Sequence, residues 1–381
     1  MNVLIYGASS SCLELRHEIP LAIMDPFLYL EAGERRAVLT NSLEELRIAA
    51  VAPDLELILG EELGRHELIA QGHPRWWVRH ELCVRAASAL GIREAMVPPD
   101  FPLALAERLR AAGVAVAPDE TLFVERRRHK SEAELAGIRR ASEVAVAAMG
   151  EAARTLREAS IDGDRLLEQG ETLTVEILRA RVRELSARAG APIGADMIVR
   201  AMTANAAIGH DPGAGPLPPH TAIEIDLWPC DETSGCWSDM KRTFVRGEIS
   251  EAIAALHRLV LETHEQVCAA VAPGMAAIDL YDMACEPFER AGHPTLRTEA
   301  PGETLRSGFY FCLGHGVGLD VHEPPLLCVG STDTLVAGDV IAVEPGLIVP
   351  GVGGAGVEDL LLLTDAGCER LTGEFSYDLT P

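Results

Sequence analysis

Two aspartates near the middle of the chain lie where carboxylates could hold a cation. Asp226 falls in the strand-like run Ile223–Trp228, and Asp239 follows thirteen residues later beside another β-type stretch. The segment between them is rich in turn-forming residues, so we expect a hairpin that brings the two carboxylates together. Two buried carboxylates side by side repel each other unless a cation or a proton neutralises them. A buried Asp can also accept hydrogen bonds from turn amides, so the pair alone leaves both interpretations open.

A glycine-rich segment further along, Gly314–Pro324, carries two histidines seven residues apart, His315 and His322. Glycines on both sides of His315 let another segment or a ligand approach the backbone closely. This composition is unlike that of a core helix. It favours a role in a functional site over a packing role for both histidines.

Two glutamates lie in apolar, strand-like segments near the C-terminus. Glu344 follows Ile341–Val343, and Glu358 lies within Gly356–Leu360, with Pro and Gly residues between them that suit a second hairpin. An unpaired charge there would cost on the order of several kcal/mol. Four inward carboxylates and one neutral imidazole carry about four negative charges, which two divalent ions balance. The charges therefore favour a dimetal centre over a single zinc site, which would use more His or Cys.

The pattern from about residue 125 onward predicts the elements that position these residues. Helical periodicity is found in four stretches, at 131–159, 173–189, 251–272 and 278–291. Strand-like segments that carry Asp, His and Glu separate them. Helices packed on a sheet rich in antiparallel pairs, an α+β design, fit this order best.

Residues 1–124 predict a separate, small α/β domain. The expected strands and helices are Ala37–Thr40, Leu55–Leu59 and Val114–Ala117, and Arg79–Leu90 and Phe101–Ala112. The GASSS segment at 7–11 lacks the further glycines of a dinucleotide fingerprint and the Lys of a P-loop, so it indicates a plain strand-to-helix turn. The basic cluster Arg126–Lys130 marks the boundary. We expect it to pair with acidic surface groups and not to bind an anion.

Composition limits the classes of partner. A chain of 381 residues predicts two domains, and a net charge of −25 disfavours nucleic acid and anionic membrane surfaces. No apolar run is long enough to span a bilayer, and the N-terminus lacks a secretion signal. The nine scattered cysteines form no CxxC pair, which predicts reduced thiols in a cytoplasmic protein. A bridge between Cys230 and Cys236 is a minor alternative.

Taken in order, the motifs of the C-terminal two-thirds resemble those of the pita-bread metallopeptidases, which include Xaa-Pro aminopeptidase, prolidase and methionine aminopeptidase. The matching segments are RHKSEAELAGIRRA, NAAIGH, IDLW, SDMKRTF, GHGVGLDVHEP, VEPG and GVED. Residues 1–124 resemble, more loosely, the creatinase-type N-terminal domain. Methionine aminopeptidases generally lack that domain, so the resemblance favours the proline-specific group.

The resemblance implies two divalent metal ions and a set of ligands. The five expected ligands are Asp226, Asp239, His315, Glu344 and Glu358, with Asp239 and Glu358 bridging both ions. An oxygen-rich site with one imidazole suits Mn²⁺, and Co²⁺, Fe²⁺ or Zn²⁺ can also occupy such a site.

The implied chemistry is hydrolysis of the peptide bond before a proline by a water that the two ions activate. In this scheme Glu344 accepts the water's proton, and His322 donates a hydrogen bond to the developing oxyanion. His210 helps to hold the substrate near the scissile bond.

The expected function is therefore that of an Xaa-Pro aminopeptidase, acting on peptides with proline at the second position and working as a homodimer. Three alternatives remain: an Xaa-Pro dipeptidase, a relative that acts on a non-peptide substrate as a hydrolase or lyase, and a non-catalytic binding module. The complete set of acidic ligands argues against the binding module.

Three features depart from the family pattern. Asp226 and Asp239 are two residues further apart than is usual, which implies a longer hairpin tip. Ile348 stands where a Tyr is usual. Gly356 stands where an Arg is usual, so a cation expected near Glu358 is missing. Because neighbouring groups orient metal ligands, these departures bear on metal affinity and substrate choice.

Overall fold

The structure is a computed structural model that describes residues 1–203, 209–300, 302, 304–373 and 375–381. The chain divides into two compact units, Met1–Ala133 and Glu134–Pro381. The boundary that the sequence places near residue 125 falls within a helix, Glu120–Arg128. Each unit has its own hydrophobic core.

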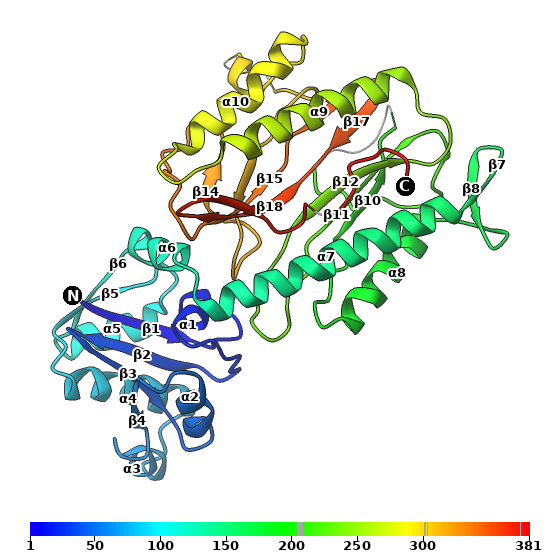
Figure 1. The fold of residues 1–381 in the computed structure, drawn as a ribbon. Helices are drawn as coiled ribbons and strands as arrows, with labels where there is room; N and C mark the ends of the chain where they lie inside the picture. Colours follow the sequence, from blue (N-terminus) through cyan, green and yellow to red (C-terminus); the bar gives the residue numbers. More distant parts are fainter. Residues whose placement is uncertain (204–208, 301, 303, 374) are drawn as a thin grey trace. The chain divides into compact units, whose positions relative to one another are not determined.

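The first unit is built on a six-stranded mixed sheet with the strand order β4-β3-β2-β1-β5-β6 (Figure 1). Its strands are β1 (Asn2–Gly7), β2 (Phe27–Ala32), β3 (Arg35–Thr40), β4 (Glu56–Leu59), β5 (Glu94–Val97) and β6 (Ala115–Pro118). Its helices are α1 (Leu13–Glu18), α2 (Glu45–Val51), α3 (Arg65–Ala70), α4 (Arg75–Ala89), α5 (Leu103–Ala111) and α6 (Glu120–Arg128). The strands and helices predicted for this region are confirmed to within a few residues.

Two smaller expectations for the first unit are also confirmed. The GASSS segment connects β1 to α1 as a plain turn. In the basic cluster, Arg126 forms ion pairs with Glu18, at 2.9 Å, and with Glu31. The cluster is therefore neutralised by carboxylates within its own unit.

The second unit consists of helices packed on several small sheets. Its helices are α7 (Glu132–Glu158), α8 (Val175–Arg188), α9 (Glu251–Ala270), α10 (Ala277–Arg290) and the short 3₁₀ helix η1 (Leu296–Thr298). A hairpin-like sheet, β7 (Ser160–Asp162), β8 (Arg165–Glu168) and β9 (Glu171–Thr172), follows α7. The four predicted helical stretches correspond to α7, α8, α9 and α10.

Two sheets form the centre of the second unit. One has the order β10-β11-β12, with β10 (Ile198–Ala201), β11 (Ala222–Leu227) and β12 (Met240–Val245). The other has the order β14-β13-β15-β18-β19, with β13 (Gly314–Gly316), β14 (Glu323–Leu327), β15 (Val340–Val343), β18 (Asp359–Thr364) and β19 (Gly367–Arg370). The pair β16 (Gly346–Val349) and β17 (Gly353–Gly356) forms a separate hairpin.

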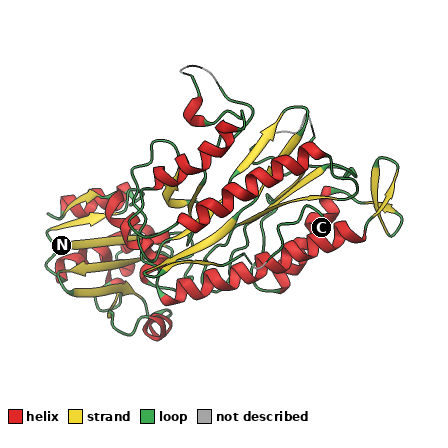
Figure 2. Ribbon diagram, turned by 45° about the horizontal axis from the view of Figure 1, so that its top comes forward, coloured by secondary structure: helices red, strands yellow, loops and turns green. Residues whose placement is uncertain are grey.

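The long helices cover the outer faces of these sheets. Helices α7 and α8 share a core with β10, β11 and β12, whereas α9 and α10 share a core with β13, β15 and β18. Figure 2 shows the two helix pairs on opposite sides of the strands. The strands between them are therefore buried on both sides, and a polar side chain on them needs a partner.

A buried histidine of α9, His264, makes the stability of this unit depend on pH. Burial lowers the pKa of His264 to about 4, although Asp359 at 3.6 Å opposes that shift. An unfolded histidine takes up its proton near pH 6.5, so acidification from 6.5 to 4 favours the unfolded state by about 3 kcal/mol. We expect His264→Leu to flatten the fall in melting temperature over that range. Equal slopes for the two proteins in a thermal-shift series would contradict this expectation.

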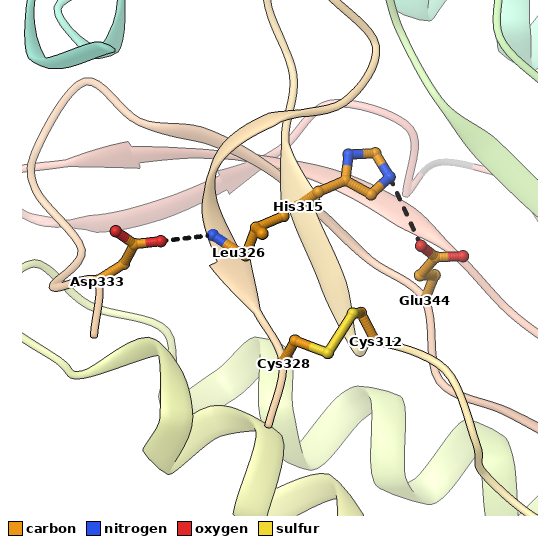
Figure 3. The surroundings of a disulfide bond; sticks show 6 residues. All are labelled: Cys312, His315, Leu326, Cys328, Asp333 and Glu344. Carbon is orange, nitrogen blue, oxygen red and sulfur yellow. Dashed lines mark hydrogen bonds and ion pairs between the residues drawn. A yellow bond between two sulfur atoms is a disulfide. The ribbon is translucent and has the colours of Figure 1, made fainter. Parts of the chain in front are cut away.

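No described helix is both long and apolar enough to cross a lipid bilayer. The expectation that all the cysteines are reduced thiols is wrong for one pair. Cys312 and Cys328 form a disulfide that joins the segment before β13 to the segment after β14 (Figure 3). The two half-cystines approach because β13 and β14 pair as antiparallel neighbours, with Gly314 opposite Leu327. Cys230 and Cys236 form no disulfide.

We expect the double change Cys312→Ser, Cys328→Ser to destabilise the second unit by about 3 kcal/mol, the loop-closure contribution for a loop of this length. Differential scanning calorimetry without reductant measures the shift, which corresponds to roughly 6–12 °C. Cys368→Ser, which removes an exposed thiol, is the matched control. Identical melting temperatures for the wild type and the double variant would show that the disulfide contributes nothing.

Candidate metal centre

The hairpin of β11 and β12 places two carboxylates and one amine on the same face. The strands pair in antiparallel register, with Asp226 directly opposite Lys241. Asp239 lies two residues before Lys241, so strand alternation directs both side chains to that face. The hairpin predicted between Asp226 and Asp239 is confirmed.

His315 comes from the short strand β13. A Cβ atom at Gly314 would collide with the carbonyl oxygen of Ala342, and one at Gly316 with that of Pro324. The flanking glycines are therefore required by neighbouring strands and not by a ligand. The Nδ1 atom of His315 lies 3.0 Å from the carbonyl oxygen of Gly316. With the proton assigned to Nδ1 as the donor, Nε2 is left free to bind an ion.

The two glutamates come from the ends of paired strands. Glu344 follows β15, and Glu358 lies between β17 and β18, whose pairings close the second predicted hairpin. The backbone N–H of Glu358 donates to the carbonyl oxygen of Lys241 at 3.0 Å. This bond joins the two sheets at the point where their acidic residues meet.

The side chains from these strands converge on one place. The Nε2 atom of His315 lies 3.5 Å from Oε1 of Glu344 and 3.8 Å from Oδ2 of Asp239 (Figure 3). Asp239, His315 and Glu358, all buried, each offer an atom within 4.8 Å of the others. Asp226 reaches the cluster through Lys241. The structure thus brings together all five residues expected as ligands.

The buried carboxylates of this cluster fit a divalent cation. The Oε2 atom of Glu358 is buried and has no hydrogen-bond partner among the described residues. Burial, and then the charges of neighbouring carboxylates, raise the pKa of both Asp239 and Glu358 well above its usual range. A bound cation removes both penalties, because it supplies the missing partner and the missing positive charge.

Lys241 is the residue of this site that sequence reasoning missed. Its Nζ atom lies 3.0 Å from Oδ2 of Asp226 and 2.7 Å from Oε2 of Glu344. Although burial opposes the charged form, Asp226 and Glu344 raise the pKa of Lys241 well above its usual value. The charge balance drawn from the sequence left this ammonium out, and the conclusion that the centre lacks a nearby cation is wrong. A signal was present, because Lys241 follows Asp239 at the spacing of one strand face.

The two remaining histidines extend from the cluster towards solvent. The ring of His322 meets that of His315 edge-on at 4.3 Å, and the ring of His210 lies 6.2 Å from that of His322. Burial, and then the neighbouring His315, lower the pKa of His322. His315 is buried whereas His322 and His210 are exposed, so the three rings lead from the cluster to the surface.

A buried ion pair supports the segment that carries His210. Arg200 on β10 donates to the carbonyl oxygen of Gly209 at 2.7 Å and pairs with Glu224 on β11. Residues 205–208 of the NAAIGH motif lie outside the described residues.

Comparison with curated proteins gives partial matches to peptidases. The Xaa-Pro dipeptidase of Pyrococcus furiosus is 36% identical over 137 residues, which cover 35% of this chain and 35% of the relative. An uncharacterised peptidase of Staphylococcus saprophyticus is 37% identical over 138 residues, covering 36% of this chain and 35% of the relative. The match therefore spans about a third of the length of these relatives.

Solved structures match over almost the whole chain. The prolidase from Pyrococcus horikoshii has a TM-score of 0.73 at 23% identity, covering 99% of this chain and 95% of that one. The X-Pro aminopeptidase from Thermotoga maritima has a TM-score of 0.76 at 20% identity, covering 99% and 96%. These likenesses confirm the α+β fold that the resemblance implied, a pita-bread domain preceded by a smaller domain.

The family itself is shown by a match to a family model. Residues 136–365, more than half of the chain, match the model of metallopeptidase family M24. The matched range contains all five acidic and imidazole residues of the cluster. The chain is therefore a metallopeptidase that belongs to family M24.

Proposed function

We propose that this metallopeptidase hydrolyses the peptide bond before a proline. The observation that carries the proposal is the buried Asp239–His315–Glu358 cluster, with its unpartnered Glu358 oxygen, in a member of family M24. Relatives named Xaa-Pro dipeptidase, at 36% and 35% identity, support proline specificity.

We further propose that two divalent ions bind there, with Mn²⁺ favoured by a donor set of carboxylates and one imidazole. The proposed ligands are Asp226, Asp239, His315, Glu344 and Glu358, of which Asp239 and Glu358 bridge. When bound, the ions supply Lewis acidity towards a water and towards the scissile carbonyl.

The chain's own residues then handle the proton and the substrate. Glu344, half-buried at the rim of the cluster, accepts the proton of the attacking water. His322 donates a hydrogen bond to the carbonyl oxygen as negative charge develops on it. His210, furthest from the cluster, holds the substrate, and Arg200 fixes the backbone beside it.

A substrate-length series tests the proposal. Purified protein supplied with Mn²⁺ is incubated with an Xaa-Pro dipeptide, an Arg-Pro-Pro type tripeptide and longer peptides, and the released first residue is quantified. Release from the longer peptides supports the aminopeptidase activity predicted from the sequence. Release from the dipeptide alone supports the dipeptidase activity named for the relatives.

The same assay tests the remaining alternative, a non-peptide substrate, which Ile348 and Gly356 favour because both depart from the family pattern. Stoichiometric metal binding without release from any peptide of the series would refute the proposed peptidase function. Light scattering of the purified protein checks the homodimer that the family resemblance implies.

A further inference from the structure

We propose that Lys241 is a positioning residue of the metal centre, whose ammonium group holds one oxygen of Asp226 and one of Glu344 and leaves the other oxygen of each for the ions. This inference rests on the proposed function, because it assigns a role within the same site. It goes beyond that function in giving the chain a cation that the family pattern places elsewhere.

The contacts of Lys241 single it out. Its Nζ atom lies 2.7 Å from Oε2 of Glu344, while the other oxygen of that carboxylate, Oε1, faces Nε2 of His315 at 3.5 Å. Glu344 is thus divided between the ammonium and the cluster. Lys241 likewise contacts Oδ2 of Asp226, at 3.0 Å. Fixing one oxygen of a carboxylate sets the direction of the other, which is how neighbouring groups orient metal ligands.

Lysine is rare in this chain and is buried at this position. The sequence contains two lysines, Lys241 and Lys130, among 33 basic residues. Lys241 is 9% exposed and lies directly opposite Asp226 in the β11–β12 ladder. Burying an ammonium is costly unless its charge is paired and its hydrogen bonds are made. Two carboxylates meet that requirement here.

Gly356 provides the space that Lys241 occupies. A Cβ atom at Gly356 would lie 2.9 Å from Cδ of Lys241, which is closer than real Cβ contacts, and 3.6 Å from Oε2 of Glu224. The φ angle of Gly356 is not in the left-handed region, so its backbone conformation does not require glycine. The missing side chain is therefore explained by the lysine.

Positions 241 and 356 are consequently coupled. A long side chain fits at one of them and not at both, because they share the same volume. In the pattern described for the family an Arg stands at the position of Gly356, and here the positive charge enters from β12 in place of β17. A side chain at 356 would start next to Glu224, on the face of β11 that also carries Asp226.

The test compares four variants with the wild type. Lys241→Met removes the charge and keeps the length of the side chain. Lys241→Ala clears the shared volume, Gly356→Arg fills it, and the double variant Lys241→Ala, Gly356→Arg moves the cation across. Lys130→Met, at the chain's other lysine, is the control for loss of one positive charge. Each folded protein is assayed for Mn²⁺ content by elemental analysis, for Mn²⁺ affinity by calorimetry, and for kcat and KM on the Xaa-Pro substrate.

We expect Lys241→Met to weaken Mn²⁺ binding by about 10- to 100-fold, the usual effect of losing a group that orients a ligand. Removal of a positive charge by itself tightens cation binding, so weaker binding can come only from lost orientation. We expect kcat to fall with little change in KM, Gly356→Arg alone to lower the melting temperature, and the double variant to bind Mn²⁺ at least about tenfold more tightly than Lys241→Ala.

Three results would overturn the inference. An additional Mn²⁺ ion in Lys241→Met or Lys241→Ala would show that the ammonium occupies the position of an ion. Unchanged affinity and kcat would show that Lys241 positions nothing. A double variant no better than Lys241→Ala would disprove the coupling. Because affinity is measured without substrate, a wild type that binds Mn²⁺ but cleaves no peptide would refute the proposed function alone.

Discussion

Asp239→Asn is expected to abolish peptidase activity and, at the same time, to stabilise the metal-free protein. Asp239 is buried among carboxylates whose charges, after burial itself, raise its pKa. An amide of the same shape removes that repulsion, so the melting temperature of the metal-free protein should rise by roughly 2–4 °C, or about 1 kcal/mol. The same change removes a bridging ligand. We therefore expect kcat/KM to fall by at least about 10³-fold, since metal ions contribute several kcal/mol to the transition state.

The two effects are measured on one preparation, by thermal unfolding in EDTA and by peptide hydrolysis with Mn²⁺. Asp164→Asn, which neutralises a carboxylate that is 95% exposed, is the control for a change in net charge. A metal-free Asp239→Asn protein less stable than the wild type would mean that Asp239 stabilises the fold and is not held there for an ion. Retained Mn²⁺ binding and activity would remove Asp239 from the proposed ligands.

The parts of the site that were predictable from the sequence are those formed by short-range patterns. Asp226 and Asp239 are connected by a turn-rich segment between alternating strands, and such a segment has few ways to fold other than as a hairpin. The hairpin between Glu344 and Glu358 follows from the same reasoning. The fold class was accessible because helical and strand-like stretches alternate in a definite order.

The role of Lys241 was not predictable in this way, because its partners are set by strand pairing over long distances. Glu344, to which it donates, is 103 residues away in the sequence. A Lys that follows an Asp on an apolar strand is usually a solvated residue at a sheet edge. Only the register that places Lys241 opposite Asp226, together with the bridge between Lys241 and Glu358, shows that it points into the acidic cluster.

The disulfide was missed for a related reason. Cysteines spaced as Cys312 and Cys328 are, at a separation of 16 residues, carry no pairing signal without the hairpin between them. The glycines beside His315 were correctly taken as a sign of close approach, but the approaching groups are the backbones of neighbouring segments. Sequence reasoning identified the demand for small residues and could not identify what creates it.

The role proposed for His322 leads to an outcome opposite to that of Asp239: loss of catalysis with the ions retained. His322 meets His315 edge-on, and neither of its ring nitrogens is part of the Asp239–His315–Glu358 cluster. Removing a hydrogen-bond donor to the oxyanion typically costs 10²–10³-fold in rate. We therefore expect His322→Ala to lower kcat by about 10²- to 10³-fold while elemental analysis finds the same Mn²⁺ content as in the wild type.

His293→Ala, in the turn after α10, is the matched control for loss of an imidazole in the same unit. If His322→Ala loses Mn²⁺ as well as activity, the ring serves to support His315 and the cluster must extend further towards solvent than proposed. If kcat is unchanged and only KM rises, His322 binds substrate uniformly and the oxyanion must be stabilised by the ions alone. A fall in kcat at full metal content is the one result that separates a group acting in the transition state from a group that holds the site together.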